Sequence, residues 1–231
     1  AVTGTNGKTS VAHFLAQSWQ RVYGNAGMVG TLGYGLYGDL QSGSRTTPDA
    51  FRLQKALADC VRAGVEHLAM EVSSHALQQH RCQTVQFDAA VFTNLSRDHL
   101  DYHSNMADYA AAKRLLFTDY APAFAIINHD DSYGRKWFGE LNGGMQMLSF
   151  GLQEGAELRA EISAIDINGM NLRISGPWGS EEVHTCLLGE FNASNLLATA
   201  GTLALLGMPW NHVLHQVELM QPVPGRMMRL G

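Results

Sequence analysis

A short segment near the start of the chain, TGTNGKTS (residues 3–10), combines residue types that bind phosphate. Gly4 and Gly7 allow the backbone to wrap closely around an anion, and Lys8 adds a mobile positive charge. A helix that begins near Lys8 would present free backbone N–H groups to the same anion. Thr9 supplies a hydroxyl group of the kind that ligates Mg²⁺. The segment therefore predicts a site for the phosphates of a nucleotide.

One feature of this loop is unusual, and a simpler interpretation of it exists. General phosphate-loop spacing, G-x-x-x-x-G-K-[ST], requires a glycine at position 2, where the chain has Val2. A short glycine-containing sequence before a helix, here Gly-Thr-Asn-Gly, can also be merely a turn. However, Val2 and Thr3 have the character of a strand end, and apolar residues recur at helical spacing over 8–22. A strand before the loop and an amphipathic helix after it favour phosphate binding.

Glu71 is a candidate ligand for the magnesium ion that accompanies a nucleotide. Such chemistry needs oxygen ligands at the ends of neighbouring strands. Glu71 closes the apolar run HLAM and precedes VSSHAL, which places Ser73, Ser74 and His75 in the next turn. A glutamate at a strand end is often only a solvated terminus, so both interpretations stand at this point.

A second polar cluster, TNLSRDHLDYH (residues 93–103), directly follows the apolar run AAVF. This is the position at which open α/β sheets bind ligands. His99 is a candidate metal ligand through a neutral imidazole nitrogen. Single histidines are usually structural, but the density of polar groups around His99 favours a functional role.

Lys113 falls on the apolar stripe of a predicted helix over 105–117, seven residues after Met106. Burial of a lysine is costly unless the amine is paired or neutral. One interpretation is that the ammonium group reaches solvent past the stripe. The other is a neutral amine that takes up carbon dioxide as a carbamate and then ligates metal. Position alone does not separate the two.

The elements around these residues alternate between strands and helices. This βαβ rhythm predicts a doubly wound, mostly parallel sheet in one α/β domain. Residues 26–47 predict one short strand followed by loops, and 152–188 predict a small antiparallel meander around a turn at Asn168 and Gly169. Strands are expected at 67–72, 87–92, 123–128 and 145–150, with helices from Pro48 and over 105–117, 132–141, 191–206 and 210–220.

Composition argues against some classes of partner. A formal net charge of −5 and a pI near 6.0 give no overall attraction to nucleic acid or to an anionic membrane. No apolar run approaches the roughly 20 residues that span a bilayer. Cys60, Cys82 and Cys186 are widely spaced without a zinc pattern, which predicts free thiols. We expect a cytoplasmic protein without nucleic-acid or membrane partners.

Taken together, these strings resemble the Mur ligase family of peptidoglycan synthesis, and in particular its tripeptide-forming branch. The resemblance covers essentially all 231 residues, and the short loop TGTNGKT is the family's own form, which explains Val2. The other matching strings, in the right order, are EVSSHAL, QHR, FTNLSRDHLDYH, YAAAKRLLF, INHDD, GEFNASNLL and PVPGRM.

The resemblance implies a role for each matching position. Thr9 and Glu71 would hold one Mg²⁺, and His99 with carbamylated Lys113 would hold a second, with Lys8 also catalytic. Residues expected to bind ATP are Gly4, Thr5, Asn6, Gly7, Lys8, Thr9 and Ser10 at its phosphates, Asn192 and Asn195 near the adenine, and Arg226 near the phosphates or ribose. Residues expected to contact the UDP-muramoyl-dipeptide are Thr46, Thr47, Ser73 and Arg81.

The implied reaction is ATP-dependent amide formation. The dipeptide's terminal carboxylate would attack the γ-phosphorus of ATP, and the amine of an incoming diaminopimelate or lysine would then displace phosphate from the acyl phosphate. Family members also carry an N-terminal domain for the uridine end and a C-terminal domain for the amino acid. Neither matches these residues, so we expect 1–231 to be the central ATP-binding, catalytic domain.

Three alternatives belong beside this interpretation. A GTPase-like switch would need an [NT]-K-x-D motif, and no lysine of the chain is followed two residues later by aspartate. A ligase of the folylpolyglutamate synthetase type shares the loop but is not expected to carry EVSSHAL. A nucleotide-binding domain without chemistry of its own is the third.

Overall fold

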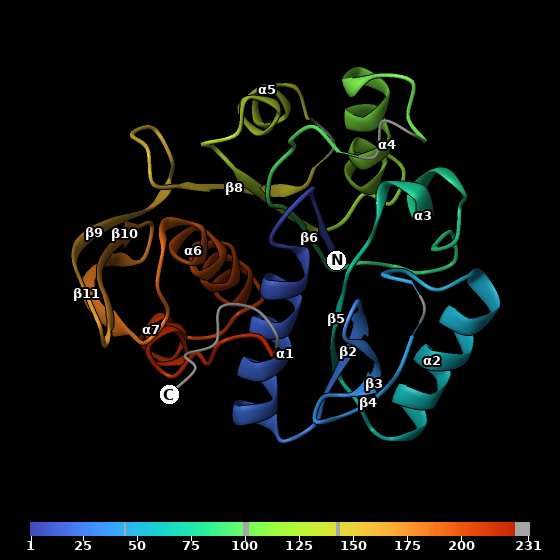
Figure 1. Cartoon of the computed structure of the whole chain (residues 1–231), viewed down its shortest axis with the longest axis horizontal. Coiled ribbons are helices and arrows are strands. Elements are labelled where there is room, and N and C mark those ends of the chain that lie inside the picture. Colours follow the sequence, from blue (N-terminus) through green and yellow to red (C-terminus); the bar gives the residue numbers. More distant parts are fainter. Residues whose placement is uncertain (44, 99–101, 142–143, 225–231) are drawn as a thin grey trace.

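The computed structural model describes residues 1–43, 45–98, 102–141 and 144–224, and its centre is a seven-stranded sheet (Figure 1). Each of the first five strands in the sheet runs parallel to its neighbour, and the last three form an antiparallel meander. In spatial order the strands are β1 (Val2–Thr3), β6 (Ala89–Phe92), β7 (Phe124–Asn128), β8 (Gln146–Gly151), β9 (Leu158–Asp166), β10 (Gly169–Gly176) and β11 (Gly179–Thr185).

A smaller sheet continues this one beyond β1. Its strands, in spatial order, are β4 (Asp39–Gln41), β3 (Gly33–Leu36), β2 (Ala26–Gly30) and β5 (His67–Met70). A parallel bridge between Val2 and Glu71 joins the two sheets, and the Val72 N–H donates to the Val2 carbonyl at 2.8 Å. The ends of β1 and β5 therefore lie side by side, which brings the phosphate loop next to Glu71.

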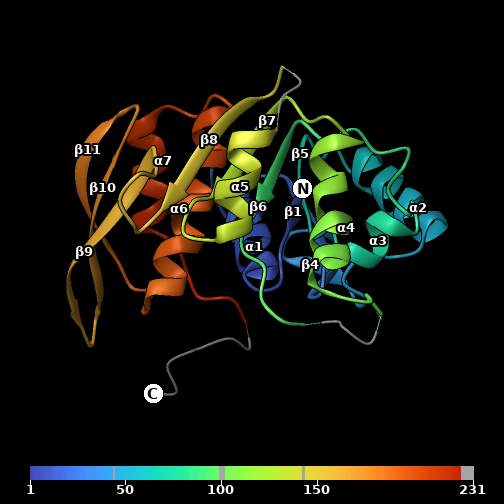
Figure 2. The ribbon, with the colours of Figure 1, turned by 90° about the horizontal axis from the view of Figure 1, so that it is seen from above.

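Seven helices of the described residues cover both faces of the sheets. Figure 1 shows α1, α6 and α7 on one side of the large sheet and α3, α4 and α5 on the other, and Figure 2 shows the meander and α2 at opposite ends of the molecule. The predicted doubly wound α/β fold is confirmed. The helices are α1 (Lys8–Tyr23), α2 (Ala50–Arg62), α3 (Ser74–Gln78), α4 (Met106–Thr118), α5 (Ser132–Glu140), α6 (Glu190–Leu205) and α7 (Trp210–Glu218).

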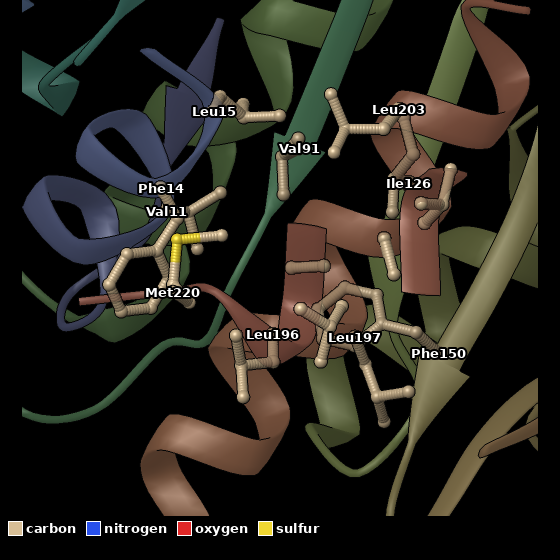
Figure 3. Packing of buried hydrophobic residues seen from close by; sticks show 14 of the residues in the cluster. Val11, Phe14, Leu15, Val91, Ile126, Phe150, Leu196, Leu197, Leu203 and Met220 are labelled. Carbon is tan, nitrogen blue, oxygen red and sulfur yellow. The ribbon is translucent and has the colours of Figure 1, made fainter. Parts of the chain in front are cut away.

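Two apolar cores hold these layers together. Figure 3 shows side chains of α1 and α6 meeting Val91 of β6 and Ile126 of β7 in the first core. The second core lies on the opposite face, where α4 and α5 pack through residues such as Tyr109 and Trp137. Because each face of the parallel strands is covered, their short apolar runs are buried on both sides.

Two expectations about the first third of the chain are wrong. Residues 26–47 form three strands rather than one, because Gly33, Gly35 and Gly38 carry the turns and kinks and leave no apolar alternation to detect. Helix α1 is not amphipathic over its first turns: it is buried from Thr9 to Trp19, since α6 covers the face that the sheet leaves open.

The remaining predicted helices and parallel strands are present with ends within two residues of those expected, and the predicted meander of 152–188 forms over 158–185. A further element that the sequence did not predict is the short helix α3, which Ser73 caps by accepting a hydrogen bond from the Ala76 N–H. Among the described residues, no helix has both the length and the apolar character that a membrane crossing requires.

Candidate active site

The phosphate loop, residues 4–7, joins β1 to α1 and fits tightly between two neighbouring segments. Gly4 and Gly7 have φ values of 151° and 83°, which favour glycine. A Cβ atom at Gly4 would lie 1.9 Å from Thr93 Oγ1, and one at Gly7 would lie 2.5 Å from Asn195 Oδ1. The two glycines are therefore required by space as well as by backbone angle.

Helix α1 begins at this loop without a side-chain cap, so its first backbone N–H groups face the loop. The Lys8 Nζ atom donates to the carbonyl oxygens of Gly4, at 2.9 Å, and Thr5, at 2.8 Å. The ammonium group thus lies directly over the loop backbone. Backbone N–H groups at a helix start and an adjacent cation form a binding site for an anion.

Residues 93–96, which we call the strap, hold this loop from the side of β6. The N–H groups of Thr5 and Asn6 donate to the carbonyl and to Oδ1 of Asn94, at 2.8 and 2.9 Å. Thr93 Oγ1 donates to the Asn6 carbonyl at 2.6 Å, and the Ser96 N–H donates to Thr5 Oγ1 at 3.0 Å. The sequence pointed to metal and ligand binding in this cluster, but not to this contact with the loop.

Glu71 is fully buried at the end of β5 and faces the loop. Its carboxylate accepts hydrogen bonds from Thr9 Oγ1 at 2.9 Å, the Thr31 N–H at 2.7 Å and Thr31 Oγ1 at 3.2 Å. Burial raises the pKa of this carboxyl group, while these donors and Lys8 oppose the rise. Gly30 makes room for it, because a Cβ there would lie 2.2 Å from Glu71 Oε1. Glu71 is therefore not a solvated strand terminus.

Thr31 is a site residue that the sequence did not single out. Its hydroxyl contacts both the Glu71 carboxylate and, at 3.2 Å, the Thr46 hydroxyl. The only signal for it in the sequence is its place directly after a glycine at the end of a short strand.

Lys113 lies beneath the phosphate loop and is 1% exposed, so the interpretation that its ammonium reaches solvent is wrong. Its Nζ atom donates to the Gly4 carbonyl at 2.8 Å and lies 4.5 Å from the centre of the Tyr109 ring. Burial lowers the pKa of this amine well below its usual range, and Lys8 lowers it further. The structure thus joins Lys8, Glu71 and Lys113 around one loop.

Two predicted site residues, His99 and Arg226, lie outside the described residues. Among the residues that are described, no three His, Cys, Asp or Glu side chains lie close enough together to hold a metal ion by themselves. Glu71 and Thr9 are an adjacent carboxylate and hydroxyl, and oxygen ligands of this kind are those that Mg²⁺ prefers. Together they could supply two ligands to one such ion.

The four residues predicted to contact the acceptor substrate lie beside Glu71. Thr47 Oγ1 donates to the Glu71 carbonyl at 2.9 Å and accepts from the Ser73 N–H at 3.0 Å. Arg81 Nη1 donates to the Thr47 carbonyl at 2.9 Å. Thr46 completes the group through Thr31, so the predicted acceptor site and the predicted metal ligand form one connected network.

A cavity of about 810 Å³ opens on the other side of the loop. Helix α6 begins at its edge, directly after Gly189, without a side-chain cap, and places Asn192 and Asn195 in the wall. Its volume and mixed lining suit a drug-sized polar ligand. The lining residues are Asn6, Gly7, Ser10, Phe14, Asn94, Cys186, Leu187, Leu188, Phe191, Asn192, Ser194, Asn195, Gln221, Pro222 and Val223.

Known proteins share this fold. A solved structure of a UDP-N-acetylmuramoyl-L-alanyl-D-glutamate--2,6-diaminopimelate ligase matches with a TM-score of 0.90 and 33% identity, over 98% of this chain and 47% of that one. MurF from Acinetobacter baumannii, at 21% identity, shares the fold with a TM-score of 0.78 over 98% of this chain and 47% of its own.

Curated relatives carry the same ligase name as that solved structure. The protein from Alkalilimnicola ehrlichii is 46% identical over 228 residues, which are 98% of this chain and 46% of that protein. The protein from Pseudomonas aeruginosa is 45% identical over 231 residues, 100% of this chain and 47% of that protein. The chain thus spans about half the length of these relatives. Because the model of the Mur ligase middle domain also matches residues 2–203, the chain belongs to that family.

Proposed function

We propose that this chain is the ATP-binding, catalytic unit of an amide ligase in peptidoglycan synthesis. The enzyme would add a third amino acid to UDP-N-acetylmuramoyl-L-alanyl-D-glutamate. The main support for the proposal is that the side chains of Lys8, Glu71 and Lys113 all lie at one phosphate loop. The names of the relatives favour diaminopimelate over lysine, and a diaminopimelate-adding ligase over a folate-type one.

In this proposal ATP spans the loop. Its phosphates would accept hydrogen bonds from the N–H groups at the start of α1 and would lie against the Lys8 ammonium. The adenine and ribose would occupy the cavity of about 810 Å³, within reach of the amides of Asn192 and Asn195. Arg226 remains a proposed contact of the phosphates or ribose.

Two magnesium ions belong to the proposal. Glu71 and Thr9 would hold the first, because a buried carboxylate that shares a hydrogen bond with a hydroxyl supplies the oxygen ligands that Mg²⁺ prefers. His99 and Lys113 would hold the second. A charged lysine has no lone pair for a metal ion, and a neutral amine is a poor match for Mg²⁺, which prefers oxygen ligands. Lys113 would therefore act as a carbamate, whose formation requires the neutral amine that its burial favours. When bound, the metal ions neutralise charge on the transferring phosphate.

The network around Glu71 would align the acceptor. Thr46, Thr47, Ser73 and Arg81 would contact the UDP-muramoyl-dipeptide so that its terminal carboxylate faces the γ-phosphorus of ATP. Attack breaks the bond to ADP and gives an acyl phosphate, and the incoming amine then displaces phosphate to form the amide. Phosphoryl transfer asks a protein mainly for alignment and charge neutralisation, which these side chains supply without a protein nucleophile.

Residues 1–231 would be the central domain of a longer cytoplasmic enzyme. The curated relatives are about twice as long, and the further half would hold the uridine end of the acceptor and the incoming amino acid. The partners in this proposal are therefore small molecules: ATP, the UDP-muramoyl-dipeptide and the amino acid.

Release of ADP by the full-length protein tests the proposal. We expect release only when UDP-N-acetylmuramoyl-L-alanyl-D-glutamate, ATP and an amino acid are all supplied, with diaminopimelate used faster than lysine. Equal release with a folate and glutamate would support the folylpolyglutamate alternative. Preference for GTP over ATP, with no new amide, would support a nucleotide switch.

A further inference from the structure

The segment INHDD, at the end of β7, matches the family but has no role in the reaction described above. Its first polar residue, Asn128, is 6% exposed. Asn128 Nδ2 donates to the Thr93 carbonyl at 2.6 Å, and Asn128 Oδ1 accepts from the Asp130 N–H at 2.8 Å. The side chain thus fastens the first residue of the strap to the end of the neighbouring strand.

Asp131 makes a second connection to the strap. Its Oδ2 atom accepts from the Leu95 N–H at 2.7 Å. Its Oδ1 atom caps α5 by accepting from the N–H groups of Tyr133, at 2.8 Å, and Gly134, at 3.2 Å. A Cβ at Gly134 would lie 1.9 Å from the Asn128 carbonyl oxygen, so the start of α5 is seated directly on the end of β7. Asp131 therefore connects the strap to the start of α5.

The strap carries these connections on to the phosphate loop. Its residues Thr93, Asn94 and Ser96 bond to Thr5 and Asn6, as described above. The ends of β7, β6 and β1, which are adjacent in the sheet, are thereby linked in one series of hydrogen bonds. Asn128 and Asp131 stand at the far end of that series and do not line the nucleotide cavity.

We propose that Asn128 and Asp131 are positioning residues of the nucleotide site, which hold the strap and thereby fix the phosphate loop before the nucleotide binds. The inference rests on the proposed ATP site. A loop with two glycines has many conformations, and ordering it on binding would subtract from the affinity for phosphate. A loop already bonded to Thr93, Asn94 and Ser96 of the strap avoids that cost. Loss of the outer bonds should therefore weaken nucleotide binding without any loss of direct contact.

The neighbouring Asp130 provides a matched control. Its carboxylate also accepts two backbone N–H groups from a distant segment, those of Leu152 at 2.7 Å and Gln153 at 3.0 Å. That segment joins β8 to β9 and does not contact the phosphate loop. Asp130→Ser and Asp131→Ser each remove hydrogen bonds of the same kind from the same short sequence, but only the second releases the strap.

Binding of Mg²⁺ and ADP to the full-length protein, measured by calorimetry, tests the inference. Serine is itself a good helix cap, so Asp131→Ser should keep α5 while losing the bond to Leu95. We expect its Kd for ADP to rise about tenfold, which corresponds to about 1.4 kcal/mol. Asn128→Ser should behave similarly. Asp130→Ser should change the Kd by less than about twofold even where it lowers the Tm as much.

Asp131→Asn replaces one carboxylate oxygen with an amide nitrogen and can be used if the serine variants do not fold. Its one remaining carbonyl oxygen can serve the helix or the strap, so we expect a smaller rise in the Kd than in Asp131→Ser. Wild-type affinity in both Asp131 variants, or equal weakening by Asp130→Ser, would overturn the inference alone. A wild-type protein that fails to bind ADP would overturn the proposed function as well.

Discussion

Charged residues are buried around the phosphate loop but mostly exposed in the meander of β9, β10 and β11. In the meander, apolar side chains such as Leu172 face the core, and exposed pairs such as Arg173 and Glu182 lie on the outside. Around the loop, Glu71 and Lys113 are buried at 0% and 1% exposure. Burial of groups that can carry a charge is costly, so these residues around the loop lower the stability of the folded state. The meander does not carry this cost.

Substitutions in these two regions should therefore have different effects. Changes around the loop should act mainly on activity and can even stabilise the fold, whereas changes in the meander should act only on stability.

Loss of the Lys113 amine should have the largest effect. In the full-length protein, Lys113→Ala is expected to lower the rate of ADP release about 10³-fold, because the proposed function places this group next to the transferring phosphate. A short carboxylic acid such as acetate should restore part of the activity, since it can replace the carbamate, whereas bicarbonate should not. Lys55→Ala, at an exposed position on α2, is the control and should keep full activity. A folded Lys113→Ala protein without any rescue would contradict the carbamate.

Protonation of His13 should produce the next largest effect. This residue of α1 is 5% exposed, and burial lowers its pKa from 6.5 to about 4. The folded state thus favours the neutral ring, and stability falls as the pH drops from 6.5 through 4. We expect a loss of about 3 kcal/mol in the free energy of unfolding between pH 7 and pH 4, measured with urea. His13→Gln should not show this part of the loss in stability at low pH.

The matched control for His13 is His212→Gln, at an exposed position on α7. It should retain the pH dependence of the wild-type chain. If His13→Gln showed the same slope with pH as the wild type, the buried neutral ring would not be the cause.

Replacement of Glu71 should lower the affinity for Mg²⁺ and raise the stability of the fold at neutral pH. Glu71→Gln keeps the shape and an acceptor for Thr31 but loses the charge, so half-maximal activity should need about tenfold more Mg²⁺. Because burial raises the pKa of Glu71, its stabilising contribution is lost as pH rises through the folded-state pKa. The variant should therefore have a higher Tm than the wild type at neutral pH without ligand, and this advantage should vanish near pH 4. A lower Tm at neutral pH would contradict this account.

The smallest effect is expected in the meander. Arg173→Ala removes an ion pair whose two side chains are 55% and 59% exposed, so the free energy of unfolding should change by less than about 1 kcal/mol. Leu172→Ala, next to it on the buried face, should cost about 3 kcal/mol by contrast. Neither variant should change the Kd for ADP. A large loss of ADP affinity in Arg173→Ala would break the separation between the two regions.

The sequence predicted most of the α/β framework because its signals are local. Short apolar runs such as HLAM and AAVF, and helical spacing after the loop, each lie within a few residues. The strands at 33–36 and 39–41 were missed because glycine replaces the side chains whose alternation would reveal them. Helix α3, of five residues, is too short for a periodic signal.

The site itself was only partly predictable. The loop, Glu71 and Lys113 stand out by type and spacing, and the structure brings them together. Thr31 and the strap were not predicted in their roles, because Thr31 bonds to a residue 40 positions away and Asn94 to one 88 positions away. Such contacts follow from the order of strands in the sheet, which the local pattern does not give.

A crystal structure of the full-length protein with Mg²⁺ and ADP would test the central claim most directly. We predict the β-phosphate on the N–H groups at the start of α1 beside Lys8, the metal on Thr9 and Glu71, and the adenine in the cavity beside Asn192 and Asn195. A nucleotide bound elsewhere, or a metal ion without contact to Glu71, would contradict the account.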